Sequence, residues 1–363
     1  MKKFFVAIHK WLSLPVGLII SITCLSGAIL VFQDELQEWR SPDRYFVASV
    51  GQAPLPLDSL IPIVNRQLTD NQVKDVRIPS DPKRNYAMGL AEGFRITAYV
   101  DPYTAEVKDI YSFRESPFYI VMSLHRWMLD DTRTWGKYSV GISTLIFVFI
   151  LISGLIIWFP KKFKKSKFTI KWRKGTKRLL HDLHTVLGAY AFLLLFIGAV
   201  TGLMWSFDWY RNGVFRLFGA EIPEERSQGG AGKGEKKAAR PDLSVWQVVA
   251  DNLAFENPNN KYIRIQDGSA AVHLKNAPNS RATDKYDFDK VTGEVTDISY
   301  FKDQKKSSRI MSWAYALHVG NYWGIWSKIL TFIAGIIGAT LPLTGYYMWW
   351  KKRKKKRLSL KHH

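Results

Sequence analysis

Four histidines occupy matching places in the two halves of this 363-residue chain. His9 and His184 each stand 18 residues before a glycine and 23 residues before a phenylalanine, at the start of a long uncharged run. His125 and His318 stand 29 and 27 residues before the glycines of two further runs. Neutral imidazole is the commonest metal ligand among protein side chains. Histidines repeated at such spacing are therefore candidate ligands.

Each histidine precedes an uncharged apolar run of 22 or 23 residues. Such a run forms a helix of roughly 34 Å, enough to cross a bilayer core of about 30 Å. The runs are 11–33, 138–160, 185–207 and 329–350. We predict an integral membrane protein with four spans. A cleaved signal peptide is disfavoured, because the first run is too long and no cleavage site follows closely.

The formal net charge is +21, and its distribution indicates membrane topology rather than a nucleic-acid surface. Three basic residues precede the first run, ten lie in 161–178 and eight follow the fourth run, against one acidic residue, Asp182. The positive-inside rule places these segments and both termini in the cytoplasm, and the two long polar segments outside. Because Cys24 is the single cysteine, the outer segments are expected to fold without intramolecular disulfides.

This topology brings the histidines together in pairs. His9 and His184 belong to the cytoplasmic face, and His125 and His318 to the external face, one from each half of the chain. Two imidazoles from facing helices are what axial coordination of a haem iron requires in a helical bundle. Zinc is less favoured, because no carboxylate or cysteine stands at fixed spacing near either pair. For any one histidine alone, an interfacial polar residue is the plainer alternative.

Small residues along the first and third spans would let a flat macrocycle approach the backbone. The glycines of these strips are Gly27 in the first span and Gly188, Gly198 and Gly202 in the third. All four spans also contain a Ser or Thr followed by Gly, which generic helix packing explains adequately. We further expect the histidines at helix N-termini, where the helix dipole disfavours imidazolium and keeps the ring able to bind a metal.

Several other polar residues are candidates for a site. Lys10 and Arg126 each adjoin a candidate ligand and could meet haem propionates. His181 lies one turn before His184 and could replace it as a ligand, although it has no counterpart in the other half. His273 is expected on the surface of a strand.

The two long polar segments share one pattern, a helical stretch followed by alternating strands. The predicted helices are 57–68 and 243–253, and the predicted strands are 73–78, 85–90, 94–100, 106–111, 262–265, 270–274 and a pair within 286–300. Asp101 and Asp289 begin matching turns whose Asp and Thr residues we interpret as structural, and Gly293 suits a position with positive φ. The sequence therefore predicts two small α+β modules. The second contains a Gly/Lys/Ala-rich linker at 227–240.

The chain resembles the PepSY-associated transmembrane family of bacterial inner-membrane, iron-regulated proteins, and among them the di-haem siderophore reductases. The motifs that carry the resemblance are HKWLSLPVGL, YVDPYTAEV, LHRWML, LISGLIIWFPKK, HTVLGAYAF, DFDKVTGEV, LHVGNYWG and LTGYYMWWKK. The resemblance implies two b-type haems with bis-histidine ligation, one near each membrane face. It also implies an enzyme that passes electrons across the membrane to a periplasmic ferric siderophore, whose reduction releases ferrous iron.

The expected fold class is a four-span α-helical bundle with a two-fold internal repeat and two external PepSY-like α+β modules. The expected spans, with their flanks, are 1–33, 125–160, 181–207 and 318–350, and the second and fourth open with an external histidine turn. The expected modules are 34–124 and 208–317. A basic loop is expected at 161–180 and a basic tail at 351–363. The donor would be quinol or a separate protein, because no dinucleotide fingerprint occurs in the short cytoplasmic segments. The alternative is a haem-free PepSY sensor or regulator that binds a periplasmic partner.

Overall fold

The structure, a computed structural model, describes residues 2–159, 168–223 and 243–359. The chain divides into two compact units, each built from separate stretches of sequence. The helical unit contains Met1–Gln33, Pro117–Val214 and Ala314–His363, and the sheet unit contains Asp34–Ser116 and Phe215–Trp313. The expected linker at 227–240 lies outside the described residues, as does part of the basic loop.

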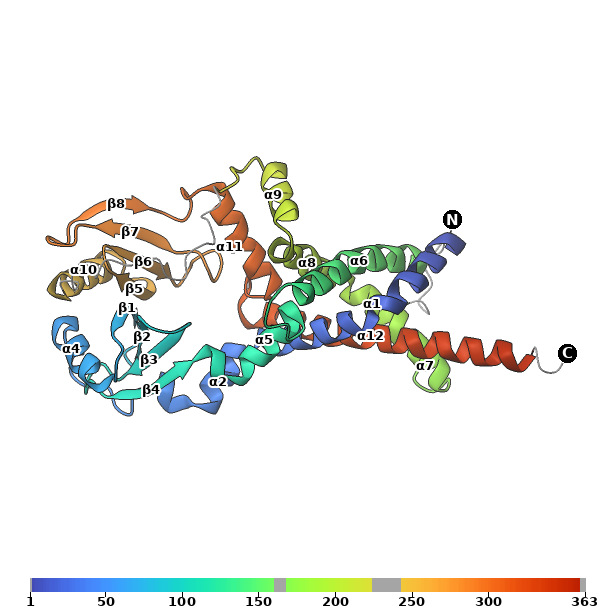
Figure 1. The fold of residues 1–363 in the computed structure, drawn as a ribbon, viewed down its shortest axis with the longest axis horizontal. Coiled ribbons are helices and arrows are strands. Elements are labelled where there is room, and N and C mark those ends of the chain that lie inside the picture. Colours follow the sequence, from blue (N-terminus) through green and yellow to red (C-terminus); the bar gives the residue numbers. More distant parts are fainter. Residues whose placement is uncertain (1, 160–167, 224–242, 360–363) are drawn as a thin grey trace. The chain divides into compact units, whose positions relative to one another are not determined.

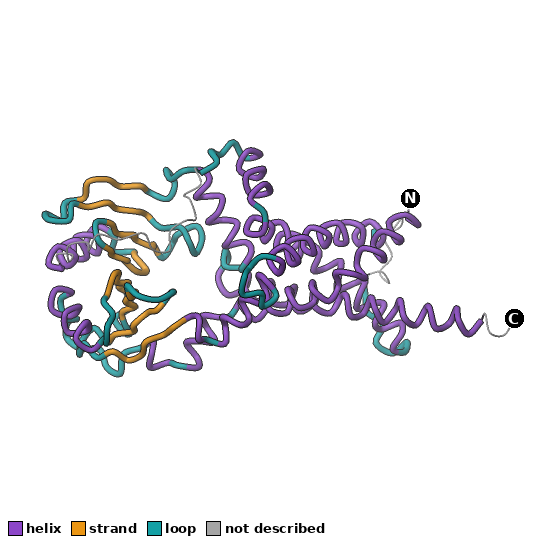
Figure 2. The backbone as a smooth tube through the Cα atoms, viewed as in Figure 1, coloured by secondary structure: helices purple, strands orange, loops and turns teal. Residues whose placement is uncertain are grey.

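Helices make up most of the helical unit (Figures 1 and 2). They are α1 Lys2–Val31, α5 Pro117–Trp127, α6 Trp135–Trp158, α7 Thr176–Asp182, a π-helical segment Leu183–Leu187, α8 Gly188–Ser206 and α12 Gly324–Ser359. Among the described residues, four stretches are long and apolar enough to cross a membrane. These are Lys2–Val31, Trp135–Trp158, Thr176–Ser206 and Gly324–Arg353. The predicted number and places of the apolar helices are confirmed.

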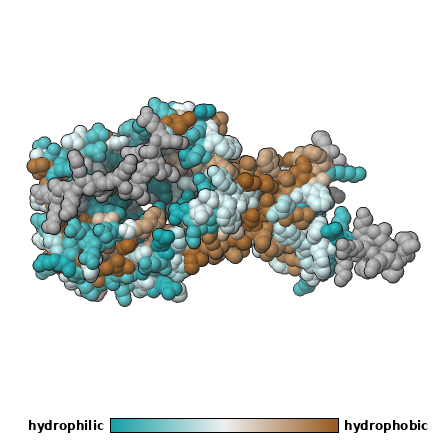
Figure 3. Space-filling model, viewed as in Figure 1, coloured by the Kyte–Doolittle hydropathy of each residue, from teal (hydrophilic) through white to brown (hydrophobic). Residues whose placement is uncertain are grey.

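The helices of this unit are apolar on both their packed and their outward surfaces. Val16, Ile20 and Leu195 are buried in a core shared by α1, α6, α8 and α12. On the outward side, Leu18 and Leu193 remain about 60% exposed in the isolated chain. Figure 3 shows hydrophobic side chains gathered over these helices. Because water would not favour such a surface, the helices are suited to a lipid bilayer.

A short ordered loop connects α5 to α6. The Asp130 carboxylate accepts backbone hydrogen bonds from Thr132, Thr134 and Gly136, and thereby caps the start of α6. His125 lies in the last turn of α5, and His318 is the last residue of α11, Lys306–His318. The expected external histidine turns are therefore the C-terminal ends of two separate helices, α5 and α11, which precede the apolar helices α6 and α12.

The sheet unit contains one antiparallel sheet of eight strands in the order β4-β3-β2-β1-β5-β6-β7-β8. The strands are β1 Val73–Pro79, β2 Tyr86–Leu90, β3 Ile96–Val100, β4 Val107–Ser112, β5 Asn260–Gln266, β6 Ser269–Leu274, β7 Asp284–Phe288 and β8 Val295–Ser299. The two predicted modules thus share one sheet, joined where β1 pairs with β5 and Arg77 lies opposite Arg264.

Two helices cover one face of this sheet, α4 Leu57–Gln67 and α10 Leu243–Glu256 (Figure 1). Leu60, Trp246 and Leu253 are almost completely buried with Val76 and Ile265 from the two central strands. The other short helices are α2 Gln33–Arg40, α3 Pro42–Tyr45 and a 3-10 helix Phe113–Glu115, together with α9 Asp208–Leu217, most of which belongs to the helical unit. The alternation of apolar residues along the strands places one row in this core, as the sequence pattern predicts.

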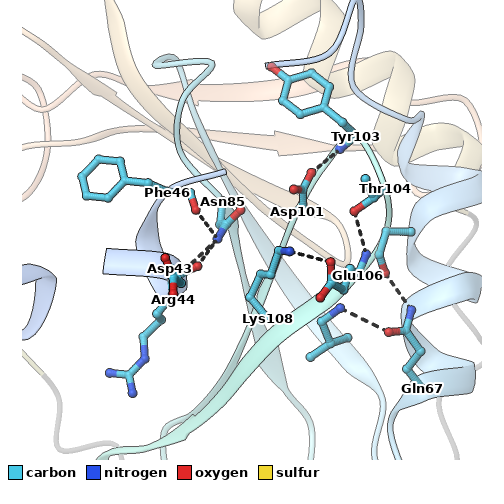
Figure 4. A network of polar contacts seen from close by, with 12 residues as sticks. Asp43, Arg44, Phe46, Gln67, Asn85, Asp101, Tyr103, Thr104, Glu106 and Lys108 are labelled. Atoms are coloured by element: carbon cyan, nitrogen blue, oxygen red, sulfur yellow. Dashed lines mark hydrogen bonds and ion pairs between the residues drawn. The ribbon is translucent and has the colours of Figure 1, made fainter. Parts of the chain in front are cut away.

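The turns that begin at Asp101 and Asp289 are structural, as predicted. The Asp101 carboxylate accepts the backbone N–H of Tyr103, and Figure 4 shows the two groups facing each other. The Asp289 carboxylate accepts the backbone N–H groups of the two residues Val291 and Thr292 in the same way. These hydrogen bonds lower the pKa of Asp289. The left-handed position is Gly293 (φ +75°) in the second turn, and an alanine (φ +60°) in the first.

His273 is buried, so its expected position on the strand surface is wrong. Its Nδ1 lies 2.7 Å from the carbonyl oxygen of Ala282, and its ring stacks on Tyr262 with the ring centres 5.0 Å apart. The guanidinium of Arg77 covers the Tyr262 ring at 3.8 Å. Burial lowers the pKa of His273, although the hydrogen bond to Ala282 opposes the shift. This stack crosses the junction between the two halves of the sheet.

The sheet unit should lose stability as the pH falls below about 6.5, the ordinary histidine pKa. Below that pH the unfolded chain binds a proton at position 273 that the folded chain resists, so acid favours unfolding. We expect the decrease in melting temperature between about pH 7.5 and about pH 5.5 to be smaller for His273→Gln than for the unmodified chain. Thermal unfolding in detergent would measure this, and equal decreases would contradict it.

Candidate functional site

The four predicted histidines form two pairs inside the helical unit. His9 of α1 faces His184 of the π-helical segment, with the ring centres 6.2 Å apart and the ring planes 82° apart. His125 faces His318 with the ring centres 5.9 Å apart and the planes 53° apart. Residues far apart in the sequence are thus brought together in the pairing that the topology predicts.

The first pair is held by the two neighbouring helices. The Nδ1 atom of His9 lies 3.1 Å from the Ile150 carbonyl oxygen and 3.1 Å from the Ser153 hydroxyl, both on α6. For His184, the corresponding distances are 3.0 Å to the Leu341 carbonyl oxygen and 2.9 Å to the Thr344 hydroxyl, both on α12. Each ring therefore meets a carbonyl and, three residues later, a hydroxyl.

The second pair repeats this arrangement on α1 and α8. His125 Nδ1 lies 2.9 Å from the Thr23 carbonyl oxygen and 3.5 Å from the Ser26 hydroxyl. His318 Nδ1 lies 3.0 Å from the Gly198 carbonyl oxygen and 3.1 Å from the Thr201 hydroxyl. All four imidazoles thus present the same nitrogen to the same kind of partner.

These contacts determine which ring nitrogen carries the proton. A carbonyl oxygen can only accept a hydrogen bond, so Nδ1 must be the donor in each ring. The hydroxyl hydrogens are directed to carbonyls of their own helix, as in the 2.9 Å bond from Ser153 to Ile150 and the 2.8 Å bond from Thr344 to Leu341. The hydroxyl oxygens can therefore also accept from Nδ1. Each neutral imidazole is left with a lone pair on Nε2, which is the form that binds a metal.

A glycine completes each of these contacts. A Cβ atom at Gly27 would lie 2.9 Å from Cε1 of His125, and one at Gly202 would lie 3.0 Å from Cε1 of His318. At Gly154 the distance to His9 would be 3.1 Å, and at Gly345 the distance to His184 would be 3.6 Å. We call the carbonyl, the hydroxyl and the following glycine a histidine socket.

The sockets explain the Ser/Thr-Gly dipeptides, which the sequence analysis assigned to generic helix packing. The dipeptides are Ser26-Gly27, Ser153-Gly154, Thr201-Gly202 and Thr344-Gly345. Each dipeptide lies opposite one histidine of another helix. The sequence already contained four such dipeptides and four such histidines. The hydroxyl residues were missed as site residues because only the folded structure shows which ring each one meets.

The expectation that the histidines stand at helix N-termini is wrong. His9 lies two turns into α1, and His184 lies within the helical stretch that begins at Thr176. His125 and His318 lie at the C-terminal ends of their helices. The Nδ1 hydrogen bonds, rather than a helix dipole, therefore determine which ring nitrogen is free to bind a metal. The π-helical turn at His184 agrees with the frequent occurrence of such turns at functional sites.

The remaining candidates differ in how closely they approach the pairs. His181 has a side chain that is 53% exposed, and its Nδ1 lies 3.4 Å from Asp182. His184, not His181, faces His9. Lys10 and Arg126 each directly follow a paired histidine in the sequence. Both side chains are exposed, Lys10 above the Trp11 ring and Arg126 beside the Trp127 ring.

The predicted small-residue strip has two separate roles. Gly202 contacts His318, and the Gly198 carbonyl accepts the hydrogen bond of the same ring, while a Cβ atom at Gly198 would meet nothing within 4 Å. Gly188 lies against Leu341. Between them Ala191 and Leu195 are buried in the core of the bundle. The strip is therefore open only in part, because neighbouring helices cover its middle.

The donor set at each pair consists of two imidazole nitrogens. In the part of the chain that the structure describes, no cluster of three or more His, Cys, Asp and Glu side chains could hold a metal ion. A tetrahedral zinc site generally requires three or four protein ligands. A pair of imidazole nitrogens instead suits a metal ion whose other ligands are not supplied by the protein.

The fold and the paired sites define a membrane-type helical bundle with an appended antiparallel sheet domain. Residues 6–352 match the family model of the PepSY-associated TM region, so the chain belongs to this family. The predicted family is thus confirmed. A comparison with curated proteins finds no match.

Alanine substitutions at the socket glycines should have opposite effects on stability. Gly27→Ala and Gly202→Ala should each lower the free energy of unfolding by about 1–3 kcal/mol, because the added methyl group overlaps an imidazole in a packed interior. Gly345→Ala is the matched control, since its methyl group would make an ordinary contact at 3.6 Å. It should be neutral or stabilising by about 0.5–1 kcal/mol through reduced backbone entropy. Denaturant or thermal unfolding in detergent would measure both, and equal effects at the three positions would contradict the socket.

Proposed function

We propose that this protein is an inner-membrane di-haem b reductase that passes electrons across the membrane to a ferric siderophore in the periplasm. The observation that carries the proposal is the repeated socket, which leaves a lone pair on each Nε2 in two pairs of facing rings. An interfacial histidine without a ligand would not need the same tautomer at four places.

The size of each pair fits an iron between the two rings. A metal–imidazole nitrogen bond is about 2 Å, so two rings whose centres lie about 6 Å apart leave room for one metal ion between them. The observed separations are 6.2 Å and 5.9 Å. His9 and His184 would hold one haem, and His125 and His318 the other. Haem would supply one-electron chemistry at each place.

The protein supplies the orientation and the surroundings of these groups. Sockets on neighbouring helices hold the rings, and the apolar bundle limits access of water between the pairs. Lys10 and Arg126 would pair with propionates at the two ends, because each follows a ligand directly and carries a positive charge. A dry, preorganised pair of ligands requires little rearrangement when an electron arrives.

We further infer a two-fold internal repeat. The two halves correspond in their sockets, in the turns at Asp101 and Asp289, and in the strand order on either side of the β1–β5 junction. With 21 basic residues on the short segments, the positive-inside rule gives cytoplasmic termini. The His9–His184 pair would then lie near the cytoplasm, and the His125–His318 pair near the periplasm.

The substrate and the donor complete the proposed electron path. Family resemblance supports a ferric siderophore, in which one added electron converts Fe³⁺ to Fe²⁺ and weakens its bonds to hard oxygen ligands. Each electron must come from an external reductant such as quinol, which loses two electrons and two protons to become quinone, or from a separate electron-transfer protein. The described cytoplasmic segments are too short to form a flavin domain.

The purified protein should contain about two haems per chain, visible as a Soret band. His184→Ala should remove the haem of the first pair and His318→Ala that of the second, leaving about one haem in each variant. His181→Ala is the control and should retain both, because its exposed ring does not face His9. A chain that is colourless after haem supplementation would contradict the proposal and favour the haem-free regulatory alternative.

A further inference from the structure

We infer that four socket hydroxyls are positioning residues that fix the rotation of the imidazoles and tune the reduction potentials of the bound irons. These residues are Ser26, Ser153, Thr201 and Thr344. The inference rests on the proposed function, since it assigns a role toward the haems. It concerns residues of this chain that do not touch the iron and act through the histidines.

The hydroxyls differ from the carbonyls in what they add. A carbonyl alone satisfies the Nδ1 proton but leaves the ring able to rock about that bond. A second acceptor on the next helical turn fixes the proton between two oxygens and so fixes the ring plane. The Thr201 hydroxyl is itself polarised, because it donates to the Ile197 carbonyl at 2.6 Å. A polarised acceptor draws the Nδ1 proton away from the ring and raises the electron density at Nε2.

Each pair contains one serine socket and one threonine socket. In the His9–His184 pair the contacts are 3.1 Å for Ser153 and 2.9 Å for Thr344. In the His125–His318 pair they are 3.5 Å for Ser26 and 3.1 Å for Thr201. The threonine contact is the shorter one in both pairs. Threonine is also stiffer at χ1, because its two heavy Cβ substituents restrict the rotamer, whereas serine turns more freely.

It follows that each iron would have one firmly oriented ligand and one less restrained ligand. The threonines would make the larger contribution to ring orientation and Nε2 basicity. Electron-rich imidazoles stabilise ferric relative to ferrous iron, so loss of a threonine hydroxyl raises the reduction potential. The difference is greatest in the second pair, where the serine contact is at the limit of hydrogen bonding.

The second pair provides a matched experiment. Thr201→Val keeps the shape of the side chain and removes the hydroxyl, Thr201→Ser restores the hydroxyl, and Ser26→Ala removes the weak contact to the other ring. We expect Thr201→Val to shift the ferric/ferrous equilibrium of that haem about tenfold toward ferrous, which is 59 mV for a one-electron couple. Thr201→Ser should recover most of the shift, and Ser26→Ala should change it much less.

Redox titration followed by optical absorption would measure the potentials, and electron paramagnetic resonance of the ferric protein would report the mutual orientation of the two rings. Thr201→Val should alter the resonance of one haem and leave the other unchanged. Haem content separates the two hypotheses. If the unmodified protein holds no haem, both fail. If it holds two haems but Thr201→Val shifts neither potential nor resonance, or Ser26→Ala shifts them equally, the positioning role alone is overturned.

Discussion

The central constraint in the helical unit is that a buried imidazole N–H must have an acceptor. A polar group left without a partner in an apolar interior costs roughly 1–3 kcal/mol, and helix carbonyls are normally occupied by their own hydrogen bonds. The carbonyls of Thr23, Ile150, Gly198 and Leu341 accept an additional bond from a histidine. Such a bond requires close approach, so a glycine stands four residues after each carbonyl. Helix spacing, glycine placement and the tautomer of the rings all follow from this one requirement.

The same contacts show how the two halves are divided. His9 and His125 both use sockets on helices of their own half, α6 and α1, and His184 and His318 use sockets on α12 and α8. Each half thus orients its own rings. The pairs, however, form only when the halves meet, as does the β1–β5 ladder of the sheet unit. In the haem sites that we propose, each half would contribute one nitrogen donor to each pair.

Much of this architecture could be predicted from the sequence, because local chemistry determines it. Uncharged runs gave the apolar helices, and alternation with turn residues located strands such as β2 and the turn at Asp289. The pairing of the histidines followed from topology and spacing. The β1–β5 junction could not be predicted, since it joins strands from opposite halves with no connecting turn. The burial of His273 was missed because its partners come from a loop and from a neighbouring strand, which the alternation within its own strand does not reveal.

The histidine sockets could be predicted from the sequence only in part. Their residues were visible as repeated Ser/Thr-Gly dipeptides, but glycine beside a small hydroxyl residue is also what close helix packing requires. The distinguishing fact is a distance across helices, such as the 2.9 Å between Thr344 and His184. In a membrane bundle, packing and ligand orientation call for the same small residues, because both require backbone and ring to approach closely. Composition alone does not distinguish a packing role from a ligand-orienting role for such a dipeptide. Its recurrence once per span, in equal number with histidines at fixed spacing, therefore favours the ligand-orienting role.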